Sequence, residues 1–175
     1  NYGASNRTIG FIPAIEMGLI TMPQILGTFL FRDHSTRKRN LILWHFVFVI
    51  PFLFLMGLLI IFAGRLGPGP TVFWLLTLFS FYILSMGIII SVWMNWLADI
   101  FEKSVRGRAL GICFGVSSLT GAAGALLSGH LVRNFNGGTA GFGALYIAAG
   151  IIACFSMASV CFVKESYPEK IPQHA

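Results

Sequence analysis

The sequence predicts an all-α integral membrane protein. Five apolar runs each exceed the roughly 20 residues that a helix needs to cross about 30 Å of hydrocarbon. Charged residues make up only 10% of the chain, and the mean hydropathy is +0.80. A soluble domain carries about 25% charged residues, so this composition favours a bilayer as the solvent. The runs form a single predicted transmembrane domain, residues 1–175, and cover residues 9–31, 41–63, 71–98, 109–132 and 140–163.

The first two runs are predicted to be kinked helices. Pro13 and Pro23 interrupt the first run, and Pro51 lies midway along the second. A proline inside a helix removes one backbone hydrogen bond and bends the axis. The first run also contains Glu16, the only acid well inside a predicted span.

The third run is the longest, about 42 Å at 1.5 Å per residue, and is expected to tilt or to project from the membrane. Residues 65–70 before it are predicted to form a tight turn, because prolines cannot continue a helix. Residues 134–138 are predicted to form the turn between the fourth and fifth runs. Every connection is shorter than a dozen residues, so no soluble domain is expected.

The distribution of lysine and arginine predicts the orientation. Nine of the 12 fall in the loops after the first and third runs and in the tail, and three fall on the other side. The positive-inside rule then places loops 32–40 and 99–108 and the C-terminal tail in the cytoplasm, in a multi-pass protein of the cell membrane. The expected partner of these basic residues is the lipid bilayer, with its anionic headgroups, and not nucleic acid.

The cysteines predict neither a disulfide framework nor a metal site. Cys113, Cys154 and Cys161 all lie inside predicted spans, their number is odd, and no Cys/His cluster accompanies them. We expect them to pack as small apolar residues. No cofactor is indicated, and no nucleotide-binding loop suggests that ATP drives the protein.

The predicted orientation puts the N-terminus outside the cell, yet residues 1–10 do not have the pattern of a signal peptide. The chain also begins with Asn1 and not with methionine. We therefore expect one helix to precede Asn1, which would make the chain a fragment of a larger protein. A complete five-span protein with an external N-terminus is the alternative.

The loop after the first run contains an acid followed by a basic run. Asp33 is followed by Arg37, Lys38 and Arg39. This loop resembles the signature loop of the major facilitator superfamily, Gly-x-x-x-Asp-Arg/Lys-x-Gly-Arg-Arg/Lys, which joins the second and third helices of that family. The departures from the pattern, in place of Gly, Arg/Lys and Gly, are Phe29, His34 and Thr36.

A second loop resembles the same family. Asp99 lies near the end of the third run, and Arg106, Gly107 and Arg108 precede the fourth. In the family an acid closes the fourth helix and Arg-Gly-Arg-Ala opens the fifth, although the proline common before that arginine is absent here. If one helix precedes the chain, the five runs are helices two to six of the N-terminal half, and both motifs are in register.

The resemblance implies a partial six-helix transporter bundle with five of its helices present. It implies secondary active transport of a small solute by alternating access, and no enzymatic activity. The implied partners are an unidentified solute, protons or sodium ions as coupling ions, and the remaining helices of the parent chain. One alternative is a scaffold or sensor that keeps the fold and transports nothing. A membrane enzyme is disfavoured, because Asp33 and His34 are the only adjacent pair of possible catalytic side chains.

The resemblance also implies that Asp33, Arg37 and Asp99 belong to a cytoplasmic latch. An acid and nearby fixed cations can bridge the ends of neighbouring helices by charge-assisted hydrogen bonds. Contacts made in only one conformation would favour one transport state. The alternative is that the basic residues only set topology and bind lipid.

Two polar residues in the spans are candidates for the substrate or proton pathway. Glu16 is the stronger candidate, because an ionisable group in a membrane must face a cavity or a partner. The alternatives are a structural acid that is hydrogen-bonded and an acid that is hydrated near the outer end of the span. Asn95 is the weaker candidate, since it is close enough to an interface to be hydrated.

Small residues recur in the fourth run. Gly121, Ala125 and Gly129 are spaced by four, with Gly124 beside them. This spacing lets two helix backbones approach closely, so a helix-packing face is predicted here.

Overall fold

The computed structural model describes residues 6–33, 35–135 and 138–164, and every regular element among them is a helix. Five stretches are long and apolar enough to cross a membrane. The predicted all-α membrane fold is therefore confirmed. The elements are α1 (Asn6–Thr21), α2 (Gln24–Leu30), α3 (Arg37–Trp44), the π-helical turn η1 (His45–Val49), α4 (Ile50–Ile61), α5 (Ala63–Leu66), α6 (Pro68–Ile100), α7 (Arg106–Asn134) and α8 (Thr139–Val160).

Prolines divide the first two spans. The first span breaks at Met22 and Pro23, so that α1 and α2 are separate helices. In the second span Pro51 lies in the first turn of α4, directly after the wide turn η1. A π-type turn removes the α-helical hydrogen bond that a proline cannot donate, which lets the span continue past Pro51.

The turn before the third span is shorter than predicted. Residues 65–70 were expected to lie outside helices, but Arg65 belongs to α5, and Pro68 and Pro70 form the first turn of α6. The first backbone N–H groups of a helix have no partner in the helix, so proline is tolerated there. Gly67 alone makes the reversal, with a φ of +79° that glycine adopts without strain. The buried Thr71 hydroxyl donates to the Gly67 carbonyl at 2.6 Å.

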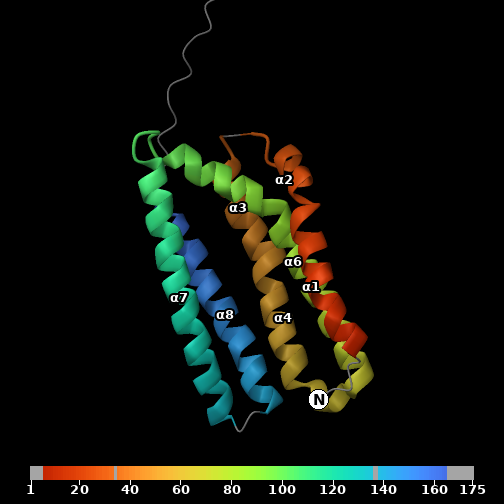
Figure 1. The fold of residues 1–175 in the computed structure, drawn as a ribbon. Helices are drawn as coiled ribbons and strands as arrows, with labels where there is room; N and C mark the ends of the chain where they lie inside the picture. Colours follow the sequence, from red (N-terminus) through yellow and green to blue (C-terminus); the bar gives the residue numbers. More distant parts are fainter. Residues whose placement is uncertain (1–5, 34, 136–137, 165–175) are drawn as a thin grey trace, which may run out of the picture.

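Helix α6 is the centre of the bundle. The broken helix α1–α2 packs along α6, α4 packs against both α6 and α8, and α7 lies beside α8 at the edge (Figure 1). A cluster of buried apolar side chains fills the space between α2, α3, η1 and α6. Its members are Phe31, Leu41, Val49, Ile88, Ile89, Val92 and Trp96.

Glycines bring three helix pairs into backbone contact. A Cβ atom at Gly57 of α4 would lie 2.9 Å from the Gly143 carbonyl oxygen of α8, and one at Gly143 would lie 2.8 Å from that of Gly57. A Cβ at Gly27 of α2 would overlap the α6 backbone, and one at Gly87 of α6 would overlap the α1 backbone. These positions admit only glycine unless the helices separate.

Helix α7 differs from the other spans, because none of its 29 residues is buried. Among the described elements its main packing partner is α8. Leu119 and Leu126 are 75% and 78% exposed. The open faces of α7 are therefore available to lipid or to further helices.

Candidate functional site

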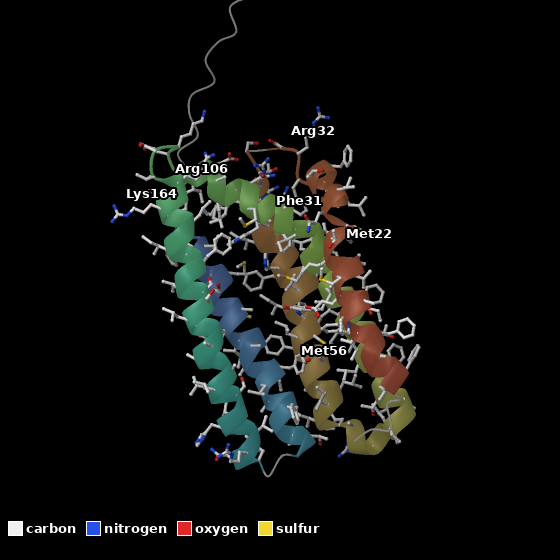
Figure 2. All side chains as sticks on the ribbon, in the orientation of Figure 1. Met22, Phe31, Arg32, Met56, Arg106 and Lys164 are labelled. Atoms are coloured by element: carbon white, nitrogen blue, oxygen red, sulfur yellow. The ribbon has the colours of Figure 1, made fainter. Side chains whose placement is uncertain are left out.

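Both motif-bearing loops lie at the same end of the bundle. Residues 31–33, 35–36 and 101–105 and the C-terminus of α8 lie there, and Gly67 and the C-terminus of α7 lie at the opposite end (Figure 1). We call the end that carries the two motif-bearing loops the basic end. Figure 2 labels Arg32, Arg106 and Lys164 there. Residue 34, the turn residues 136–137 and the tail from residue 165 lie outside the described residues, and the side of the membrane that the basic end faces remains a prediction.

Arg37 and Asp99 form an ion pair at the basic end. Arg37 is the first residue of α3, Asp99 lies in the last turn of α6, and the Nη1 to Oδ2 distance is 2.9 Å. The Arg37 side chain is 10% exposed and that of Asp99 is 43% exposed. A carboxylate at a helix C-terminus lies near the negative end of the helix dipole. The guanidinium therefore stabilises Asp99 in an otherwise unfavourable place.

Lys38 binds a different helix end. Its Nζ donates to the carbonyl oxygens of Cys161 at 2.9 Å and Val163 at 2.7 Å, just beyond the C-terminus of α8. The last carbonyls of a helix lack intrahelical partners and carry partial negative charge. The lysine ammonium group donates hydrogen bonds to them and offsets that charge. Two consecutive residues of α3, Arg37 and Lys38, thus hold the ends of α6 and α8.

Asp33 orders the loop that precedes α3. Its carboxylate accepts hydrogen bonds from the Ser35 backbone N–H at 2.9 Å, the Ser35 hydroxyl at 2.8 Å and the Thr36 hydroxyl at 3.5 Å. Aspartate commonly forms such local turns. Thr36 occupies a position where the family pattern has glycine, but its φ of −107° is open to any residue. Threonine can therefore replace the glycine of the family pattern at position 36 without backbone strain.

The other residues of the two motifs have different surroundings. Arg39 and Arg108 are exposed, and a Cβ at Gly107 would meet open space. Arg106 is half-buried, and its Nη2 donates to the Phe101 carbonyl at 3.4 Å. Within the described part of the chain, none of these four residues forms a hydrogen bond or ion pair with Arg37 or Asp99.

The structure places Glu16 and Asn95 apart from each other. Glu16 is exposed on α1. Asn95 lies near the end of α6, where it lines a cavity of about 180 Å³ with Thr28, Arg32 and Arg37. Glu16 does not line this cavity, so the two candidates for one pathway do not share a site.

The predicted packing face of α7 makes no close contact within the described chain. Gly121, Gly124, Ala125 and Gly129 are exposed, and Cβ atoms at the three glycines would meet nothing within 4 Å. The close contacts instead use Gly27, Gly57, Gly87 and Gly143, which were not predicted. The spacing of seven between Gly143 and Gly150 places both on one helix face and was a usable signal. Gly57 and Gly87 are single glycines in apolar helices and carry no such pattern.

Comparison with known proteins identifies the family of this chain. The family model described as Major Facilitator Superfamily matches residues 1–175, the whole chain. The chain therefore belongs to the major facilitator superfamily, a family of membrane transporters. Neither the curated proteins nor the solved structures contain a match.

Proposed function

We propose that this chain is part of a secondary active transporter that moves a small solute by alternating access, coupled to protons or sodium ions. The family match over residues 1–175 carries this proposal. Transporters of this family pair two six-helix halves around a site near the bilayer midplane and rock one half against the other. On this proposal the five spans are helices two to six of the first half.

The exposure of α7 supports the presence of further helices. Transmembrane helices associate through small residues that let their backbones approach. Gly121, Gly124 and Gly129 present such a surface, and nothing in the described chain covers it. Transport on this proposal requires helices beyond these five, because the solute site lies between the two halves.

The contacts at the basic end support a latch on the cytoplasmic side. Arg37 joins α3 to α6, and Lys38 joins α3 to α8. These contacts hold three spans together as one body, against which a second half could move. A state in which that half also engages the loop at Asp33 would be favoured over a state in which it does not.

Glu16 is the proposed coupling or substrate-binding acid. Its side chain is exposed on an apolar, membrane-length helix, and a carboxylate facing lipid there would be costly. We infer that it faces a water-filled pathway or a polar partner from outside the five helices. A proton or a cationic substrate group would then have a carboxylate to bind.

The test is proton flux in vesicles that contain the intact parent protein. A pH-sensitive dye trapped inside reports proton movement, a sodium-sensitive dye reports sodium movement, and labelled candidate solutes report solute uptake. We expect solute-dependent proton movement in the wild type, its loss in Glu16→Gln, and its retention in Glu102→Gln, which removes an exposed loop carboxylate. Solute flux without proton or sodium movement would overturn ion coupling. Absence of flux for all solutes, with the protein correctly folded, would favour the scaffold alternative.

A further inference from the structure

An apolar groove lies at the end of the bundle that carries Gly67, opposite the basic end (Figure 1). It has a volume of about 380 Å³ and lies between the end of α4 and the start of α6. Leu55 and Phe62 line it on one side, and Trp74 and Leu78 line it on the other. From residue 55 to residue 62 the groove extends about 10 Å along α4, at about 1.5 Å per residue. The groove therefore runs from the end of the bundle toward its middle.

Two polar groups lie at this groove, at different depths. The Arg65 guanidinium lies over the ring of Phe62, 5.3 Å from its centroid, at the end of the bundle. Trp74 lies beyond Pro68, the first residue of α6, by about 9 Å along that helix. Within the described chain the Trp74 indole N–H has no hydrogen-bond acceptor. A cation thus lies at the mouth of the groove, and an unused donor lies in its wall.

The described part of the chain does not neutralise the charge at the mouth of the groove. Its acidic residues are Glu16, Asp33, Asp99 and Glu102. The last three lie at the basic end, and Glu16 does not line the groove. Arg65 forms no ion pair with any of them. The mouth of the groove therefore attracts an anion.

The lining of the groove favours a lipid chain over a further helix. Leu55, Phe62 and Trp74 are each about half exposed, so these large apolar side chains contact hydrocarbon in a bilayer. Helices in membranes associate at small residues that let their backbones approach. None of the residues that line the groove is smaller than leucine. The close helix contact of α4 is made instead by Gly57, which packs against α8.

We propose that this groove binds one anionic phospholipid from the leaflet at this end of the bundle. In a bilayer the phosphate lies nearest to water, the ester carbonyls lie below it, and the acyl chains lie deepest. These three parts match Arg65, the Trp74 N–H and the leucine-lined groove in the same order. Indoles are enriched at the headgroup level, and arginine forms charge-assisted hydrogen bonds to phosphate. This lipid site is independent of the proposed transport.

The test is native mass spectrometry of the full chain in detergent, titrated with phosphatidylglycerol, phosphatidylcholine or oleate. We expect one phosphatidylglycerol to bind more tightly than any further copies, and more tightly than phosphatidylcholine. Arg65→Gln should weaken that binding about fivefold, because it removes the cation beside the phosphate. Trp74→Phe keeps an aromatic ring but removes the N–H, and should weaken the binding about threefold. The control Arg133→Gln removes an exposed cation at the same end, outside the groove, and should change the affinity less than about twofold.

Several results would overturn the proposal. Absence of a tightly bound phosphatidylglycerol, or unchanged affinity in Trp74→Phe, would mean that the groove does not hold this lipid. Equal weakening by Arg65→Gln and Arg133→Gln would indicate diffuse attraction to a basic surface. Equally tight binding of phosphatidylcholine would remove the role of charge, and displacement by oleate at similar affinity would assign the groove to a fatty acid. If Arg65→Gln does not fold, Trp74→Phe and the comparison of the lipids still decide the outcome.

Discussion

At the scale of single residues, the contact between Gly57 and Gly143 leaves no room for a side chain. Gly57→Ala would place its methyl group 2.7 Å from Ile147 Cγ1 and 2.9 Å from a backbone oxygen. Overpacking of this kind costs about 1–3 kcal/mol, so we expect a lower midpoint of thermal unfolding in detergent. Gly64→Ala, at a helical position with open space around it, is the control and should leave the midpoint unchanged. A tolerated Gly57→Ala would show that α4 and α8 do not pack as described.

The Arg37–Asp99 pair allows a second prediction at this scale. We expect Arg37→Gln and Asp99→Asn each to destabilise the protein, and the double variant to cost less than the sum of the two. Since Asp99 is partly exposed, the coupling energy should be about 1 kcal/mol, not the larger value of a buried pair. Denaturant titration of the four proteins of this cycle measures it. Additive effects would mean that the two side chains do not interact in solution.

At the scale of elements, Lys38 is expected to fix the end of α8. Loss of its two bonds in Lys38→Met should leave the carbonyls of Cys161 and Val163 to solvent, which favours fraying of the last turn. We expect hydrogen exchange of the amides of residues 161–163 to accelerate about fivefold, the effect of about 1 kcal/mol. The control Arg39→Met removes an exposed cation from the same helix. Similar exchange rates in both variants would refute the capping role of Lys38.

The helices show what could be predicted from sequence at this scale. Long apolar runs place the five spans, because the bilayer imposes length and composition together. The predicted bounds of the turn, residues 65–70, were wrong. The effect of proline depends on its position in the helix, and the sequence does not show where α6 begins. The bonding of Lys38 to α8 was not predictable, since its partners are backbone carbonyls 123 and 125 residues away. Every residue type has a backbone carbonyl, so the sequence does not indicate which carbonyls Lys38 binds.

At the scale of the whole molecule, the charge distribution and the motifs predict that Arg37 and Asp99 lie on the same side of the membrane, and the fold brings them into contact across 62 residues. No motif supported the prediction that Glu16 and Asn95 lie on one pathway. Polarity within a span predicts that a residue needs a polar environment but does not say which one. Glu16 faces outward from the five helices, and Asn95 lies in the cavity at the basic end.

Orientation is a further prediction at this scale. Cysteine placed at Ser104 of the loop at the basic end should react with a membrane-impermeant maleimide only after the cells are permeabilised, because the positive-inside rule puts this loop in the cytoplasm. Cysteine placed at Gly64, near the opposite end, should react in intact cells. The reverse pattern would invert the topology.

The most direct test of the transporter assignment is the accessibility of residue 16 in the membrane-embedded protein. With Cys113, Cys154 and Cys161 replaced by serine, Glu16→Cys is treated with a charged, hydrophilic thiol reagent and compared with Leu55→Cys, whose position on α4 is apolar and exposed. If α1 lines a water-filled pathway, Glu16→Cys should react at least about tenfold faster, because ionised thiolate and a charged reagent both require water. Equally slow reaction at the two positions would mean that Glu16 faces no aqueous pathway, which would contradict its proposed role in transport.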